Sequence, residues 1–226
     1  MRSTSWKLLA TLGVVTAAAA SLGGGGTFAG FTAEVKNPAN AFSNGTLVLS
    51  NTKTGGSACL STGGGSTDTN ANAACDTLIN ASVQKPGDSA TQTLTVTNSG
   101  SLAAAAFKLY SAACTNADNA ESHHGTGNPC SKVQVYVQQY SDSGFTTASS
   151  CLYGGGTATA CDFSDAGKTL AAFQTAYGSS TNGLAIGNGL AAGASAYFKV
   201  GVKLPSDADN TYQGRKATFD VTWYAS

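Results

Sequence analysis

Six cysteines are the residues of this chain best suited to covalent chemistry, and their spacing favours structural disulfides over redox or metal chemistry. They are Cys59, Cys75, Cys114, Cys130, Cys151 and Cys161. Neighbouring pairs bracket loops rich in Gly, Ser, Thr and Asn, which predicts sequential pairing, although the sequence alone leaves other connectivities open. Each bridge would close a short loop and add about 2 to 4 kcal/mol of stability. No Cys-x-x-Cys motif occurs, which disfavours a thioredoxin-like site or a zinc ribbon.

The histidines and acidic residues form no recognisable catalytic motif. His123 and His124 are the only histidines, and they are adjacent in a Gly/Asn loop near Asp118 and Glu121. A zinc peptidase typically presents His-Glu-x-x-His on one helix face, and this motif is absent from the sequence. Adjacent side chains of an extended segment point to opposite faces, so we expect a solvated loop here. A Gly-x-Ser-x-Gly nucleophile elbow is also absent, and we expect no catalytic residue, no metal and no cofactor.

Two further patterns leave ligand binding open. Asp207, Asp209 and Asn210 form an oxygen-rich cluster that could hold calcium, but without EF-hand spacing a turn capped by Asx side chains is the simpler interpretation. An aromatic set could line a carbohydrate-binding face or belong to the core. Its members are Tyr197, Phe198, Phe219, Trp223 and Tyr224. Alternation along the last strand favours the core for Phe219, Val221 and Trp223.

The N-terminus has the three parts of a secretory signal peptide. Basic residues precede an apolar run from Leu8 to Leu22, which breaks at four glycines, Gly23 to Gly26. This run is shorter than the roughly 18 to 20 residues of a membrane-spanning helix. We therefore predict a signal peptide over 1–29, cleavage between Ala29 and Gly30, no retained membrane span, and a secreted, extracellular or cell-surface protein.

Composition favours a single exported domain. Without Arg2 and Lys7, the twelve basic side chains fall to ten against twelve acidic ones, so no positive surplus is available to hold phosphates and nucleic-acid binding is disfavoured. The 28 glycines suit short strands joined by polar turns. The length after cleavage is sufficient for one sizeable core.

Alternating apolar and polar residues predict an all-β fold. The expected strands cover 46–50, 89–98, 102–113, 132–140, 195–204 and 217–224. In the fourth of these, Val133, Val135 and Val137 share one face, and Gln134, Tyr136 and Gln138 share the other. Apolar residues at helical spacing predict one short helix over 169–177. The pattern lacks a βαβ rhythm and predicts an antiparallel, jelly-roll-like β-sandwich, with at most one short helix, over 46–226.

Four blocks of this sequence together resemble the TasA and camelysin group of exported bacterial proteins. The blocks are GGGGTFAGF, AFSNGTLVLSNT, QKPGDSATQTLTVTNSGSLAAAAFKLY and LPSDADNTYQGRKATFDVTW, and they keep their order. Signal peptides of this group are typically processed by a SipW-type signal peptidase. The resemblance implies a jelly-roll subunit of biofilm-matrix fibres, in which the N-terminal segment of one subunit completes the sheet of the next. The six cysteines and the Gly/Ser/Thr/Asn insertions depart from the group.

The segment 30–45, directly after the expected cleavage site, is the candidate donor strand. Phe31, Ala33 and Val35 share one of its faces and are the expected anchors. Such a segment has too little apolar area to fold alone but can add a strand to an open sheet edge. It could instead be the subunit's own edge strand or a frayed terminus. The expected partners are other copies of the chain, the signal peptidase during export and other matrix components.

Two alternative functions stay open. One is a monomeric cell-surface binding module of adhesin type, which an exposed aromatic row would favour. The other is a camelysin-like metallopeptidase, which needs His, Glu and Asp side chains to converge in space.

Overall fold

The computed structural model describes residues 43–64, 70–81 and 85–226. The chain divides after Ser43, and the fold is that of the unit Asn44–Ser226. Several predicted features lie outside the described residues: the signal peptide 1–29, the cleavage site at Ala29 and Gly30, and the donor-strand anchors Phe31, Ala33 and Val35.

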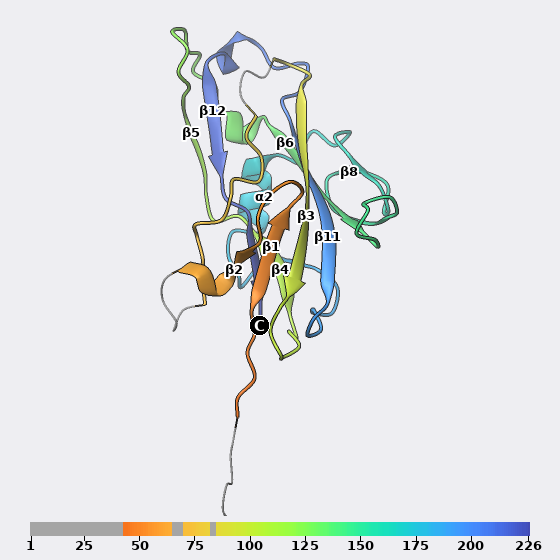
Figure 1. Ribbon diagram of the computed structural model, residues 1–226. Coiled ribbons are helices and arrows are strands. Elements are labelled where there is room, and N and C mark those ends of the chain that lie inside the picture. Colours follow the sequence, from red (N-terminus) through yellow and green to blue (C-terminus); the bar gives the residue numbers. More distant parts are fainter. Residues whose placement is uncertain (1–42, 65–69, 82–84) are drawn as a thin grey trace, which may run out of the picture. The chain divides into compact units, whose positions relative to one another are not determined.

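The larger layer of the fold is a six-stranded antiparallel sheet (Figure 1). Its strand order is β2-β1-β3-β11-β6-β7. The strands are β1 (Leu49–Lys53), β2 (Cys59–Leu60), β3 (Ser89–Asn98), β6 (Gln134–Tyr140), β7 (Ala148–Tyr153) and β11 (Ser195–Lys203).

The smaller layer combines a three-stranded sheet, in the order β10-β4-β13, with a two-stranded ribbon of β5 and β12. The strands are β4 (Phe107–Tyr110), β5 (Cys114–Asp118), β10 (Leu184–Ala185), β12 (Arg215–Phe219) and β13 (Thr222–Ala225). The remaining described elements are the hairpin β8 (Gly155–Gly156) and β9 (Cys161–Asp162), the helix α2 (Leu170–Ala176), and the 3-10 turns η1 (Ser61–Gly64), η2 (Pro129–Ser131) and η3 (Asn210–Tyr212).

The two layers enclose one apolar core. Alternation along β3 places Leu94 and Val96 on the inner face, where both are fully buried. From the smaller layer, the ring of Phe107 lies 6.1 Å from that of Phe198 in β11. The chain crosses between the layers from β3 to β4 and from β10 to β11, as in jelly rolls. Over the residues that the structure describes, the predicted antiparallel all-β sandwich with at most one short helix is confirmed.

Three predicted elements match the structure closely. The strand predicted over 89–98 is β3, and that predicted over 195–204 is β11. The predicted helix is α2, and Thr169 caps it because its hydroxyl accepts a hydrogen bond from the Ala172 backbone N–H.

Three strand boundaries were predicted wrongly. The strand expected over 46–50 is β1 at Leu49–Lys53. All five of its residues pair with β3, so the polar residues at 50–53 also belong to the sheet. Of the range 102–113, only Phe107–Tyr110 is β-strand. The strand expected over 217–224 is broken at 220–221 into β12 and β13.

The predicted division of β6 into a valine face and a face of Gln134, Tyr136 and Gln138 is confirmed, and both faces are buried. Gln138 is 3% exposed, and its side-chain amide donates to the carbonyls of Ser150 and Thr159 while its Oε1 accepts from the Cys161 N–H. Gln134 likewise donates to the carbonyl of Phe163. These two glutamines bind the chain between β7 and α2 over the outer face of β6, a distant contact that local alternation does not reveal.

Candidate functional site

The β12–β13 strand pair runs along one border of the smaller layer and ends at the C-terminus (Figure 1). β12 pairs with β5, with Phe219 opposite Cys114, and β13 pairs with β4, with Trp223 opposite Leu109. Between the two strands, the pairing shifts by one residue across 220–221. We refer to the border from Arg215 to Ala225 as the β12–β13 edge.

The positions of the hydrogen-bonded pairs along the two ladders identify which backbone N–H and C=O groups of this edge point away from β5 and β4. Ser226 and Ala106 exchange both backbone hydrogen bonds, and the Asn119 N–H donates to the Gly214 carbonyl. Bonded and non-bonded pairs alternate in an antiparallel ladder. Outward-facing N–H and C=O groups therefore belong to Arg215, Ala217, Phe219, Trp223 and Ala225. Within the described part of the chain, these backbone groups have no backbone partner.

The core-facing side chains of this edge are apolar and only partly buried. Ala217, Phe219, Val221, Trp223 and Ala225 all pack against the core from the edge. The Trp223 ring lies 5.9 Å from Phe107 and 4.4 Å from Phe198. Its indole Nε1 is buried without a hydrogen-bond acceptor among the described residues. As predicted, Phe219, Val221 and Trp223 pack against the core. They lie at its rim, where each side chain is only partly buried.

Packing is incomplete beneath the break between β12 and β13. A cavity of about 20 Å³ lies there between the layers, lined by Leu109, Val137, Phe173, Phe219 and Val221, among others. This is room for about one water molecule. Its mostly apolar lining gives water few partners, so the core contains a small unfilled volume next to the β12–β13 edge.

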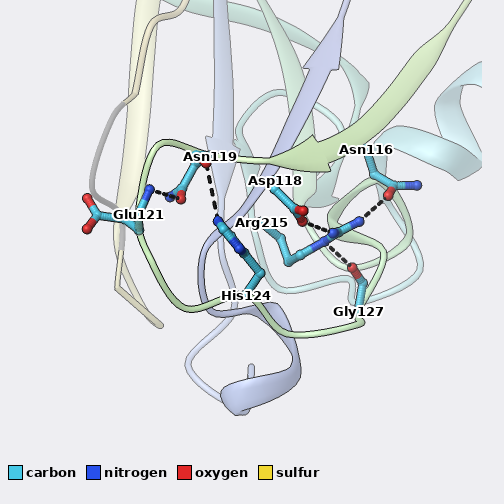
Figure 2. A network of polar contacts seen from close by, with 7 residues as sticks. All are labelled: Asn116, Asp118, Asn119, Glu121, His124, Gly127 and Arg215. Carbon is cyan, nitrogen blue, oxygen red and sulfur yellow. Dashed lines mark hydrogen bonds and ion pairs between the residues drawn. The ribbon is translucent and has the colours of Figure 1, made fainter.

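The upper end of the edge is closed by the loop between β5 and η2 (Figure 2). Gly125 and Gly127 donate to the carbonyls of Gln213 and Thr211, directly before β12. A Cβ on Gly125 would lie 2.0 Å from the Thr211 carbonyl oxygen, so only glycine permits this approach. Arg215 holds the loop in place, because its guanidinium donates to the Gly127 carbonyl and also contacts the carboxylate of Asp118.

The other strands at sheet borders are short, irregular or polar. β2 and β10 have two residues each, and the pairing of β7 with β6 shifts register twice. β5 exposes four consecutive residues, Thr115 to Asp118. Short strands, bulges and polar side chains are devices that prevent further strand pairing. Among the described borders, the β12–β13 edge is therefore the best suited to accept another strand.

All three predicted disulfides are confirmed, with the predicted sequential pairing. They are Cys59–Cys75, Cys114–Cys130 and Cys151–Cys161, and no cysteine is free. Such bridges are typical of proteins that mature in an oxidising compartment outside the cytoplasm. None of the described helices is long and apolar enough to cross a membrane.

The histidine loop does not bring its polar residues together as ligands (Figure 2). His124 Nε2 lies 3.3 Å from the Asn119 carbonyl oxygen, His123 Nδ1 lies 3.0 Å from the Ser122 hydroxyl, and Asp118 is paired with Arg215. Within the described ranges, no three His, Cys, Asp or Glu side chains are grouped as metal ligands.

The acidic cluster before β12 forms turn contacts. Asp209 caps η3 by accepting hydrogen bonds from the hydroxyl and backbone N–H of Thr211, and these bonds lower the pKa of its carboxyl group. Asp207 pairs with Lys132 at 3.0 Å. Asp209 thus has the turn-capping role that the sequence offered as the simpler interpretation.

The segment directly before β1 is held at the end of the sandwich where the C-terminus lies (Figure 1). The Thr46 carbonyl accepts a hydrogen bond from the Leu102 N–H, and the Thr46 N–H donates a hydrogen bond to the Ser101 hydroxyl. A Cβ on Gly100 would lie 2.2 Å from the Thr46 carbonyl oxygen, so glycine is required for this close contact. The chain preceding β1 is therefore anchored at the lower end of the sandwich.

Comparison with known proteins adds no relative: no protein-family model matches the chain, and a search of curated proteins gives no match.

Proposed function

We propose that this chain is a secreted structural subunit of extracellular biofilm-matrix fibres that assemble by donor-strand complementation. In this proposal, the segment 30–45 of one subunit pairs with the β12–β13 edge of the next. Cleavage between Ala29 and Gly30 by a SipW-type signal peptidase precedes assembly. The resemblance to the TasA and camelysin group supports this function, and the disulfides agree with export.

The observation that carries the proposal is the unpaired β12–β13 edge above a partly filled apolar core. An added strand gains backbone hydrogen bonds along such an edge and places alternate side chains toward the core. Phe31, Ala33 and Val35 have the required alternation. A carbonyl of the added strand could also accept from the buried Trp223 indole N–H, which otherwise carries a desolvation cost of about 1 to 3 kcal/mol.

Strand dimensions are compatible with this pairing. At about 3.3 Å per residue, a strand of the length of residues 31–42 would span roughly 40 Å, and the edge from Ala217 to Ala225 spans roughly 30 Å. Donor and acceptor are different surfaces of the subunit. Such a head-to-tail contact generates an open filament when its rotation does not close a ring.

The proposal assigns no catalytic step to the protein. The camelysin-like peptidase receives no support from the described histidine loop, whose side chains are used in local contacts. The adhesin-type alternative is favoured by one observation, an aromatic cluster on the outer face of the larger sheet.

The proposal is tested by blocking the outward hydrogen bonds of the edge in the mature chain 30–226. Ala217→Pro removes one outward N–H and retains the bonded pairs with β5 on either side, because proline is tolerated on the free side of an edge strand. We expect a folded protein with three disulfides that forms no filaments in electron microscopy. Ala225→Pro, at the other end of the edge, is an independent second variant.

Asn116→Pro is the matched control, since Asn116 lies directly opposite Ala217 and faces the other border of the ribbon. It also removes a side-chain contact to Arg215 and is thus the harsher change. We expect Asn116→Pro to assemble. Filaments of both edge variants at the wild-type level would overturn the acceptor assignment, and filaments of a chain lacking residues 30–42 would overturn the donor assignment.

A further inference from the structure

An uncharged hollow lies at the end of the larger sheet where β6 ends and β11 begins. It has a volume of about 380 Å³ and is formed where β6 and β11 diverge, between the β6–β7 turn and the loop before β11. Tyr140 and Tyr197, which are paired across these strands, line it. The opposite wall includes Gly187 and Gly189, whose positive φ values of 59° and 107° suit glycine.

Phe145 holds the two tyrosines in an aromatic cluster. Its ring lies 5.8 Å from Tyr140 and 6.1 Å from Tyr197, with both contacts edge-on. Phe145 has a φ of 54°, a left-handed conformation that is unfavourable for a bulky side chain. Strained residues persist only where their surroundings determine them, and they concentrate at functional sites.

The turn that carries Phe145 is held by the carboxylate of Asp142. This group accepts from the backbone N–H groups of Thr147, at 2.7 Å, and Thr146, at 3.1 Å. The turn is closed by the Ser141 N–H, which donates to the Thr147 carbonyl. The aromatic cluster is therefore positioned before any ligand arrives, which reduces the entropic cost of binding.

We propose that this hollow binds a neutral hexose unit of a polysaccharide. Beside the two tyrosines, four polar residues line it, Ser141, Ser149, Ser195 and Gln139, together with the apolar residues Phe107, Ile186, Leu190 and Ala196. A sugar ring combines apolar C–H faces, which pack on aromatic rings, with hydroxyl groups that need both donors and acceptors.

Charge narrows the choice of ligand. Every residue that lines the hollow is uncharged. A phosphate, a nucleotide or a peptide terminus would find no charged side chain among the lining residues to pair with. Lys199 is the nearest cation in contact with the cluster, and its ammonium group lies over the Tyr140 ring at 5.5 Å, in a cation–π contact. A neutral hydroxylated ligand fits this environment best.

The test is calorimetric titration of the mature protein with cellohexaose, laminarihexaose and maltohexaose, with hexagalacturonate as the charged comparison. We expect at least one neutral oligosaccharide to bind. Tyr197→Ala should weaken this binding roughly fivefold or more, since a lost ring contact is worth about 1 kcal/mol or more. Phe145→Asn, which tolerates the left-handed backbone, should weaken it with the fold intact.

Tyr110→Ala is the matched control, because Tyr110 is a half-buried tyrosine of β4 in the other layer. It should change the affinity by less than about twofold. The proposal is overturned if no neutral oligosaccharide binds, if only hexagalacturonate binds, or if Tyr197→Ala binds as tightly as the wild type. The same titration of the Ala217→Pro chain separates the two proposals, because binding there does not depend on filament formation.

Discussion

The borders of the two layers differ in how they are protected. At the larger sheet, the border strand β2 contains Cys59 and the border strand β7 contains Cys151, so a disulfide holds each border. In the ribbon of the smaller layer, β5 contains Cys114. The β12–β13 edge, by contrast, contains no cysteine and no proline, and its outward-facing backbone groups have no backbone partner among the described residues.

In our proposal, this difference determines at which border a further strand is added. Unpaired strand borders invite uncontrolled association, and proteins normally block them. Here each of three border strands is tied by a disulfide to a neighbouring loop or hairpin, while the outward backbone groups of the β12–β13 edge have no backbone partner among the described residues. A domain built this way can add one strand at one place, as a fibre subunit requires.

The largest effect is expected from Trp223, which joins the open edge to the core. Trp223→Ala removes its contacts with Phe107 and Phe198 and should lower the free energy of unfolding by about 3 to 4 kcal/mol. Tyr224→Ala, on the same strand but the opposite face, should cost less than about 1.5 kcal/mol. Urea denaturation compares the two, and equal losses would show that the edge does not belong to the core.

A smaller effect should follow removal of a disulfide from a protected border. The Cys151–Cys161 bridge spans 10 residues, and the double variant Cys151→Ala, Cys161→Ala should lose about 2 to 3 kcal/mol of stability. Without the bridge, β7 should exchange its amide hydrogens faster, and filaments should become irregular in electron microscopy. Unchanged stability and regular filaments would contradict the protective role assigned to this bridge.

The smallest effect concerns the turn that presents Phe145. Hydrogen bonds from the N–H groups of Thr147 and Thr146 lower the pKa of the Asp142 carboxyl group. Because the folded pKa lies below the ordinary value of about 3.9, this stabilisation is complete above about pH 4 and is lost as the pH falls through the folded pKa. NMR should show the Thr147 amide resonance shifting below pH 4, and in Asp142→Asn this titration should vanish. A shift centred near pH 6 would contradict this assignment.

The sequence correctly predicted those elements that depend on interactions between residues close together in the chain. β3 and β11 alternate strictly along their length, and Thr169 gives α2 a recognisable cap. The disulfide pairing could be predicted because short loops bring neighbouring cysteines together. These features depend on residues close in sequence.

Features that depend on distant contacts could not be predicted. The break at 220–221 arises from a register shift between β12–β13 and β4–β5, strands about 100 residues apart in sequence. The burial of Gln138 depends on the segment that folds over it. The role of Phe145 was missed as well, and its one local signal was Gly144, which marks a turn but not the rings that Phe145 contacts. Which border stays unpaired is likewise a property of the whole sheet order.

Amide hydrogen exchange in monomers and filaments tests the central claim most directly. The account predicts that the outward N–H groups of Ala217, Phe219, Trp223 and Ala225 exchange rapidly in a monomer lacking 30–42 and become protected in filaments of the mature chain. Amides of β2 and β7 should exchange alike in both. Filaments in which these four amides still exchange rapidly, while β2 or β7 becomes protected, would show that assembly uses another border and would contradict the account.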